Sequence, residues 1–309
     1  MSEKNGRDPA TDSVICVALA GGLGNQMFQF AAGHALARRT GGTLRFDLAQ
    51  YERANDKDTK RSVLLSCFGI PVPTCAGPAE ATDRASLWQR VGQRIAGSPP
   101  SQPGKPEVYR QPGYHFDDGF LALCPPVHLT GFFQSELYFA NAADEIRDVF
   151  KIRLPRSAGF ERQLAEINAC GCAVSIHVRR GDYVADAVTR DYHGTLDHDY
   201  YRRAIGIAGH LGDKPARYFV FSDEPESKLL DGIVEATYVT GNLDRPWEDM
   251  ALMAACRGHV LANSSFSWWG AWLDARPDKW VIAPRRWFSA KTERTLSTND
   301  LYCLGWIII

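Results

Sequence analysis

The sequence lacks the features that mark membrane-spanning and secreted chains. None of its 309 residues belongs to an uninterrupted apolar run of about 18 residues, the length that a membrane-spanning helix needs. The segment before Ser13 is polar and of mixed charge, without the apolar stretch of a signal peptide. We therefore expect a cytoplasmic protein. The apolar segment Trp306–Ile309 is too short to span a bilayer, and it predicts either a buried final strand or a peripheral membrane contact.

An excess of charge of one sign is also missing. The formal net charge is −1 and no stripe of basic residues is present, so we expect no nucleic-acid partner. An anionic ligand would have to be held by locally clustered arginine or lysine. With 45% hydrophobic and 23% charged residues, the composition is that of a folded globular enzyme of one or two domains.

The cysteines show no spacing that is typical of a metal site. There are eight, scattered along the chain, and Cys170 and Cys172 stand too close together for an ordinary metal or redox pair. Cys16, Cys172 and Cys256 lie in apolar runs, where a free thiol behaves as a small hydrophobic side chain. We therefore expect reduced thiols and no zinc site.

The order of apolar runs predicts an α/β fold. The strand-like run Val14–Leu19 ends in the glycine turn Gly21–Asn25, and a helical pattern follows until Gly41. In the second half, short apolar runs alternate with helical patterns, which predicts a parallel sheet. The expected strands there are 173–178, 218–221, 260–262 and 281–283, and the expected helices are 199–207, 247–256 and 266–273.

The boundary between two domains is expected within the Arg153–Gly159 stretch. This placement gives an N-terminal domain of residues 1–155 and a C-terminal domain of residues 156–309. The stretch 97–106 contains four prolines, which no packed helix or strand accommodates, so it predicts an exposed, flexible loop in the N-terminal domain.

The most informative motif is His177–Tyr183, with the sequence HVRRGDY. It begins where a buried strand is expected to end, and open parallel sheets bind ligands at the carboxyl ends of their strands. A guanidinium group is always charged and its planar fork of donors matches a phosphate, so Arg179 and Arg180 predict a diphosphate site. The alternative is a surface ion pair with Asp182, which would give one arginine a structural role.

A second motif, Asn263–Gly270 with the sequence NSSFSWWG, follows an expected strand and opens an expected helix. The free backbone N–H groups of such a helix start bind anions, and the hydroxyl groups of Ser264 and Ser265 add donors. Alternatively, one of these serines only caps the helix while the tryptophans pack in the core. Capping and phosphate binding are compatible.

Polar residues also follow two other expected strands. Asp223, beside Ser222, predicts an acceptor for a ribose or a guanine ring, or else a cap of a helix that begins at Pro225. The turn before Met27 begins like a dinucleotide fingerprint but lacks its third glycine. It is either only a tight turn or a loop that points Asn25 and the adjacent Gln26 into a cleft between domains.

Four segments together resemble the bacterial α-1,2-fucosyltransferases, glycosyltransferase family eleven. They are GGLGNQMFQF at 21–30, HVRRGDYV at 177–184, YFVFSDEPE at 218–226 and NSSFSWWGAWL at 263–273, and only 53–110 carries little of the resemblance. The resemblance implies two Rossmann-like domains that face a cleft, the GT-B fold, with the acceptor on the N-terminal side. It further implies a GDP-L-fucose donor, inversion at the anomeric carbon, and no required metal or cofactor. The implied acceptor is a galactose-terminated oligosaccharide or glycolipid-linked glycan.

The same resemblance assigns roles to residues. Arg179 would hold the β-phosphate as the bond breaks, with Arg180 and Asp182 shaping the same site. His177 would orient the loop, and Asn25 would lie close to the breaking bond. The expected donor-binding residues are His177, Arg179, Arg180, Ser222, Asp223, Asn263, Ser264, Ser265 and Phe266. Candidates for the acceptor contact or the general base are Gln26, Asp182, Asp191 and His193. The alternatives are another acceptor hydroxyl, another GDP-deoxysugar donor, or an inactive glycan-binding or scaffold protein.

Overall fold

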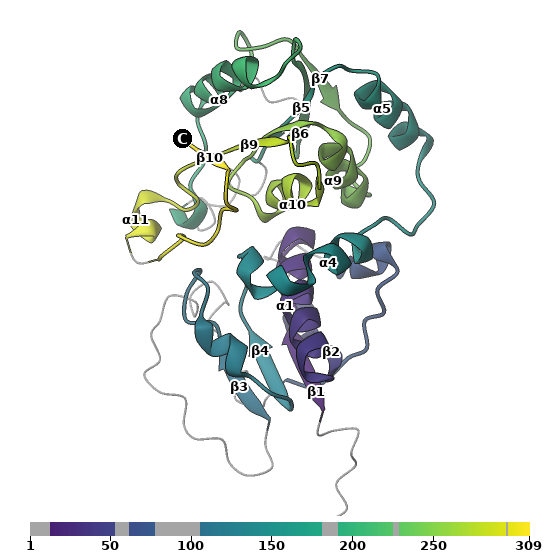
Figure 1. Cartoon of the computed structure of the whole chain (residues 1–309), viewed down its shortest axis with the longest axis vertical. Helices are drawn as coiled ribbons and strands as arrows, with labels where there is room; N and C mark the ends of the chain where they lie inside the picture. The colour runs from purple at the N-terminus through teal and green to yellow at the C-terminus, as the bar shows by residue number, and fades with distance from the viewer. Residues whose placement is uncertain (1–12, 53–61, 78–105, 181–190, 225–228, 295) are drawn as a thin grey trace, which may run out of the picture. The chain divides into compact units, whose positions relative to one another are not determined.

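The chain divides into two compact units (Figure 1). The computed structural model describes residues 13–52, 62–77, 106–180, 191–224, 229–294 and 296–309. The N-terminal unit is Met1–Phe150 with Asn299–Leu301, and the C-terminal unit is Lys151–Thr298 with Tyr302–Ile309. The division therefore falls after Phe150, a few residues before the expected boundary. Of the proline-rich stretch, residues 97–105 lie outside the described ranges.

The N-terminal unit contains a four-stranded parallel sheet in the order β2-β1-β4-β3. Its strands are β1 (Val14–Ala18), β2 (Thr43–Asp47), β3 (Glu107–Arg110) and β4 (Val127–Thr130). Helix α1 (Leu23–Thr40) joins β1 to β2 and ends at Gly41, whose left-handed φ of 71° suits a glycine cap. The other helices in the described part of this unit are α2 (Ala49–Glu52) and α4 (Ala143–Val149), with short 3-10 turns at 65–68, 118–122, 136–138 and 140–142.

The C-terminal unit contains a six-stranded parallel sheet in the order β10-β9-β8-β5-β6-β7. Its strands are β5 (Ala173–Val178), β6 (Arg217–Ser222), β7 (Ala236–Val239), β8 (Gly258–Val260), β9 (Trp280–Ala283) and β10 (Ile307–Ile308). Its helices are α5 (Ala158–Asn168), α8 (His198–Leu211), α9 (Pro246–Ala255), α10 (Ser265–Leu273) and α11 (Ala290–Glu293). Both units confirm the predicted α/β class, and the helices predicted in this unit all form.

Helices cover both faces of the C-terminal sheet, so its central strands are buried on both sides. Val174, Ile176 and Val178 of β5 pack with α8 on one face. Phe219 and Phe221 of β6 pack with α5 and α9 on the other. Strand order runs outward from β5 to β7, and the chain then returns to place β8 on the opposite side of β5. The switch point between β5 and β8 is where sheets of this kind bind ligands.

The apolar C-terminus forms an edge strand. Ile307 and Ile308 of β10 pair in parallel with Ile282 and Ala283 of β9, and all are part of one sheet. Of the two alternatives for this segment, the structure contains the strand, which is half-buried rather than fully buried. No helix in the described part of the chain has both the length and the apolarity that crossing a membrane requires.

The expectation that every thiol is reduced is wrong for one pair, because Cys16 and Cys75 form a disulfide. Thr74 forms a bridge with Phe46 of β2, and the Cys75 N–H donates to the Phe46 carbonyl. Because β2 lies beside β1, this pairing places Cys75 at a Cα distance of 6.2 Å from Cys16. Cys172 and Cys256 are free and buried in the core, as expected.

Candidate active site

The two main sequence motifs meet at the switch point of the C-terminal sheet. His177 lies near the end of β5, and Asn263–Ser265 follow β8, its neighbour in the sheet. The rings of His177 and Phe266 are in contact, with centroids 5.6 Å apart. Segments that are far apart in the sequence therefore form one site, as the strand-end argument predicts.

Carboxylates at the end of β6 hold the two arginines. The Arg179 Nη1 lies 3.0 Å from the Asp223 Oδ2, and the backbone N–H of Arg180 donates to the Asp223 Oδ1 over 2.9 Å. The Arg180 Nε donates to the Glu224 Oε2 over 2.9 Å. Both arginine side chains keep part of their surface exposed. The guanidinium groups are thus fixed beside the switch point while still accessible to an anion.

This arrangement differs from two sequence expectations. Both oxygens of Asp223 bond to the arginine segment, so the carboxylate positions that segment and has less capacity to accept from a ribose or guanine. Ser222 accepts from the Glu224 N–H and so stabilises a turn. Asp182, which the alternative interpretation paired with an arginine, lies outside the described residues, as does Pro225.

The start of α10, which follows β8, forms another part of the site. Ser264 is the N-cap, and its Oγ accepts from the Phe266 N–H over 3.3 Å. Ser265, the first residue of this nine-residue helix, is half-buried. The cap prediction is confirmed for Ser264, and the helix start still presents backbone donors and the positive end of its dipole to an anion. Trp268, Trp269 and Trp272 are buried, as the core alternative predicts.

Asn263 ties loops of the C-terminal unit together. Its Nδ2 donates to the carbonyl oxygens of His193 and Trp287 over 3.0 and 3.2 Å. Only 3% of the residue is exposed. These contacts with backbone indicate that Asn263 positions the loops beside the site, and its expected contact with the donor stays a prediction.

His177 is buried and uncharged. Its carbonyl accepts from the Tyr201 hydroxyl over 2.9 Å. Burial is the main cause that lowers its pKa to about 4, with Arg179 lowering it further and Asp223 opposing the shift. A neutral imidazole beside the arginines supports the expected role of orienting the loop.

The candidates for the general base lie in different environments. Asp191 is exposed, whereas His193 is buried and stacks on Phe288 at a centroid distance of 5.7 Å. The His193 carbonyl bonds to Asn263, which connects this segment to the end of β8.

In the N-terminal unit, Asn25 and Gln26 have different environments although they are adjacent. The Gln26 Nε2 donates to the carbonyls of Gly21 and Ser62, and its Oε1 accepts from the Leu64 N–H. Its amide is fully buried and fully used, so the expectation that it contacts the acceptor does not fit. Asn25 instead accepts from the Gln134 Nε2 over 2.8 Å.

Sequence reasoning missed Gln134, Glu224 and Tyr201. Gln134 comes shortly after the end of β4, so the signal that found the other candidates, a polar residue after a buried strand, also applied to it. Glu224 was visible beside Asp223 but was given no role. Tyr201 acts through a backbone carbonyl, for which the sequence carries no signal.

Two other clusters resemble functional sites by residue type but lie outside the candidate site. Ser175, His259 and Asp274 are linked by contacts of 3.0 and 3.1 Å like a hydrolase triad, yet all three are buried within the C-terminal unit. Asp197 and Asp199 have the spacing of a metal-binding pair, but Asp197 caps α8 and Asp199 pairs with Arg202. Within the described ranges, no group of three His, Cys, Asp or Glu residues is placed to hold a metal ion.

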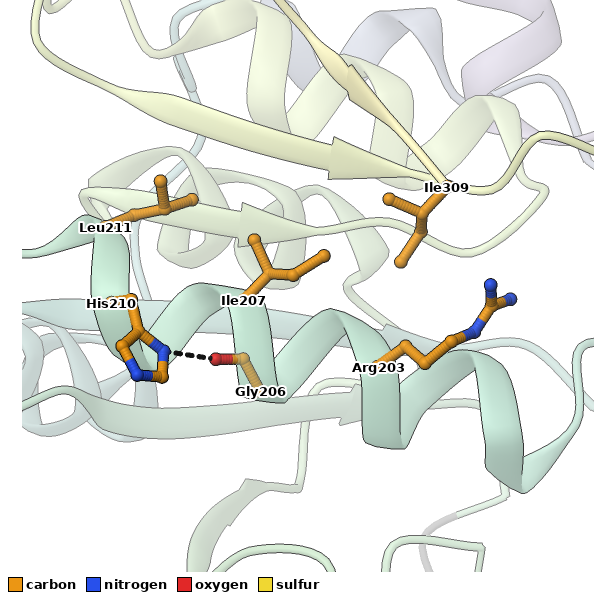
Figure 2. Close-up of a pocket in the computed structure, with 6 residues that line it drawn as sticks. All are labelled: Arg203, Gly206, Ile207, His210, Leu211 and Ile309. Carbon is orange, nitrogen blue, oxygen red and sulfur yellow. Dashed lines mark hydrogen bonds between the residues drawn. The ribbon is translucent and has the colours of Figure 1, made fainter.

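An open hollow of about 520 Å³ lies beside α8 (Figure 2). Figure 2 shows Ile207, Leu211 and Ile309 around it, with His210 bonded to the carbonyl of Gly206. None of the predicted site residues lines this hollow. It is therefore distinct from the site at the switch point.

The fold and the site define an α/β protein whose C-terminal unit can bind an anion, as enzymes that use nucleotide substrates do. A family model described as glycosyl transferase family 11 matches residues 112–309, which include the whole C-terminal site. The chain belongs to glycosyltransferase family 11, and the resemblance seen in the sequence is confirmed.

Relatives identified by sequence support this assignment. The chain is 30% identical over 299 residues to an alpha-1,2-colitosyltransferase of Escherichia coli, which covers 89% of this chain and 93% of that protein. It is 26% identical over 272 residues to the galactoside alpha-(1,2)-fucosyltransferase 1 of Saimiri sciureus, which covers 82% of this chain and 63% of that protein. The structure of the fucosyltransferase NodZ from Bradyrhizobium aligns with a TM-score of 0.46 at 16% identity, over 84% of this chain and 92% of that one.

Proposed function

We propose that this chain is an inverting α-1,2-fucosyltransferase that transfers L-fucose from GDP-L-fucose to O2 of a galactose-terminated glycan. The observation that carries the proposal is the meeting of Arg179, Arg180 and the start of α10 at one switch point. A site of this kind suits a diphosphate. The names of the two relatives, a colitosyltransferase and a galactoside fucosyltransferase, support a 1,2-linkage and a deoxysugar donor.

In the proposed reaction, the bond from the anomeric carbon of fucose to the β-phosphate oxygen breaks and its electron pair stays on GDP. The acceptor oxygen forms the new bond on the opposite face of the sugar, which inverts the anomeric centre. Negative charge grows on the leaving diphosphate, where the Arg179 guanidinium and the α10 amides would stabilise it. The acceptor proton passes to a base, for which Asp182, Asp191 and His193 are the candidates.

We further propose that the reaction needs no metal, because the arginines supply the positive charge that a metal ion would otherwise provide. Asp223 and Glu224 support this role by holding the arginine segment in place. The proposed acceptor is an oligosaccharide or a glycolipid-linked glycan, met in the cytoplasm or at the inner face of the membrane.

The first test measures product formation from GDP-fucose and a panel of galactose-terminated acceptors in the presence of EDTA. Replacing Arg179→Ala removes a preorganised donor, and such donors contribute about 3 to 4 kcal/mol, so we expect kcat to fall by about a hundredfold or more. Arg202→Ala is the matched control, because Arg202 is an exposed arginine on α8 that pairs only with Asp199 among the described residues. We expect the control to keep full activity.

The outcomes separate the alternatives. Loss of activity in EDTA would contradict the metal-free mechanism. Equal activity of the two arginine variants would contradict the proposal that Arg179 stabilises the diphosphate. No transfer and no GDP binding would favour an inactive glycan-binding or scaffold protein. Running GDP-fucose, GDP-colitose and GDP-mannose side by side tests the donor, and a clear preference for either of the last two would overturn the choice of fucose.

A further inference from the structure

A second switch point lies in the N-terminal sheet. Strand β1 pairs with β2 on one side and with β4 on the other, so the strand order reverses between β1 and β4. Asn25 lies in the first turn of α1, after β1, and Gln134 follows β4. Their side chains meet at the carboxyl ends of these two strands, which is the position where parallel α/β sheets bind ligands.

The two amides leave one acceptor and one donor group unused. The Gln134 Nε2 donates to the Asn25 Oδ1 over 2.8 Å, and only 3% of Gln134 and 6% of Asn25 is exposed. Among the described residues, the Gln134 Oε1 is buried without a hydrogen-bond partner, and the Asn25 Nδ2 donates to none. A buried acceptor without a partner is costly, which points to a ligand that supplies the missing bond.

Neighbouring contacts fix the loop that carries Gln134. The Gln29 amide accepts from the Ala20 N–H and donates to the Gly131 carbonyl, which ties the end of β1 to the end of β4. The Gln111 Oε1 accepts from the N–H groups of Phe132 and Phe133 over 3.0 and 2.8 Å.

The backbone of this loop is also strained. Phe133 has a left-handed φ of 51°, the single non-glycine residue with positive φ in the described ranges. Such strain costs about 1 to 3 kcal/mol and persists where the surroundings hold it, often at binding sites. In the turn that follows β1, a Cβ on Gly21 would come within 2.4 Å of the Asn25 Nδ2. Glycine at this position therefore leaves room for the Asn25 side chain.

We propose that Asn25 and Gln134 together bind one hydroxyl group of a reacting sugar. A sugar hydroxyl both donates and accepts, so it can donate to the Gln134 Oε1 and accept from the Asn25 Nδ2. The pair is uncharged, as suits a neutral sugar, whereas the arginine site of the C-terminal unit suits a diphosphate. This inference rests on the proposed function, and it adds Gln134 as a residue that recognises either the acceptor glycan or the fucose ring.

The test replaces Gln134→Met, which keeps the length of the side chain but removes both polar groups. KM and kcat are measured for GDP-fucose and for an accepted galactoside, together with hydrolysis of GDP-fucose without acceptor. We expect kcat/KM to fall about tenfold or more for the sugar that is bound, because one of its hydroxyls loses its partner. A raised acceptor KM with unchanged hydrolysis would show that Gln134 binds a hydroxyl of the acceptor. A raised donor KM with reduced hydrolysis would show that it binds a hydroxyl of the fucose ring.

Deoxy sugars make the test independent of folding. If Gln134 binds a given hydroxyl, an acceptor or donor that lacks it should react equally well with the wild type and with Gln134→Met, since the interaction is already missing. Gln134→Glu retains an acceptor oxygen and should recover part of the activity. Gln163→Met is the control, because Gln163 bonds to Thr240 and Asn242 in the C-terminal unit.

An equal loss of kcat/KM with every deoxy analogue, or a fall in kcat with both KM values and the hydrolysis rate unchanged, would overturn the inference, because Gln134 would then have only a structural role. Failure of the proposed function is visible separately, because the wild type itself would then transfer no fucose to any acceptor. GDP affinity, measured by calorimetry, should be the same for the wild type and Gln134→Met. A variant with a weakened GDP affinity would also contradict binding of a neutral hydroxyl.

Discussion

Adjacent polar residues of the candidate site differ in which of their atoms are already bonded. Gln26 uses its amide to bind backbone groups at Gly21, Ser62 and Leu64, whereas Asn25 shares a single bond with Gln134. The presence of a polar residue after a buried strand therefore does not establish that it contacts a ligand. Its unused donors and acceptors are the better guide, because these are the groups that a ligand can satisfy.

His177 gives a prediction about pH and stability at the residue scale. Its pKa is about 4 in the folded protein, below the ordinary value of 6.5, mainly because it is buried. Below pH 6.5 His177 becomes protonated in the unfolded chain, whereas in the folded chain it becomes protonated only near pH 4. The contribution to the free energy of unfolding is thus complete above pH 6.5, and it falls by about 1.4 kcal/mol per pH unit between these values.

Urea unfolding, followed by tryptophan fluorescence from pH 4.5 to 7.5, measures this effect. All tryptophans except Trp88 belong to the C-terminal unit, so the signal reports on the unit that contains His177. We expect the free energy of unfolding to change less steeply with pH in His177→Gln than in the wild type. The difference in slope should correspond to one proton. The exposed His210, replaced by glutamine, serves as the matched control for the loss of a histidine. Identical slopes for His177→Gln and the wild type would show that His177 titrates normally.

At the scale of the element, the sequence predicts the parts whose periodicity is complete. Strand β5 and helices α8, α9 and α10 form where expected, because buried strands and buried helix faces leave clear apolar patterns. Strand β2, with the sequence TLRFD, was missed because only Phe46 and Asp47 are buried and the pattern is mostly polar. Strand β8 occupies Gly258–Val260, shifted from the expected 260–262, because the apolar run continues past the end of the strand.

The candidate site likewise contains residues that local sequence patterns predict and residues that they do not. The arginines were predictable because they follow a strand directly, and the cap at Ser264 because it opens a helix. Gln134 also follows a strand, but its pairing with Asn25, 109 positions away in the sequence, leaves no local signal. The bond between Cys16 and Cys75, separated by 59 positions, likewise depends on strand pairing that local patterns do not contain.

The disulfide gives the prediction at the scale of the element. It ties β1 to the segment after β2, and closing a loop of this length should stabilise the folded N-terminal unit by about 2 to 4 kcal/mol. We expect reductant, or Cys16→Ser, to lower the melting temperature measured by circular dichroism. Cys124→Ser, which removes an exposed free thiol, is the control. Rapid alkylation of both Cys16 and Cys75 in the native, unreduced protein would contradict the pairing.

At the scale of the whole molecule, each unit has one switch point and the two differ in charge. The C-terminal switch point gathers Arg179, Arg180 and a helix start, and the N-terminal one gathers the amides of Asn25 and Gln134. An anion is stabilised by the first and gains little from the second. The proposed reaction accordingly assigns the diphosphate to the C-terminal unit and a sugar hydroxyl to the N-terminal unit.

Hydrogen exchange measured by mass spectrometry tests this division in the intact chain. GDP alone should slow exchange of backbone amides at 177–180, 222–224 and 263–267, because bound donors open less often. It should leave 20–25 and 131–135 unchanged, and these should become protected only when a sugar substrate is added. Arg179→Ala should remove the protection by GDP at the same nucleotide concentration. Protection of the N-terminal segments by GDP alone would instead place the diphosphate beside the amide pair, where no described charged contact supports it, and would reverse the assignment of the two units.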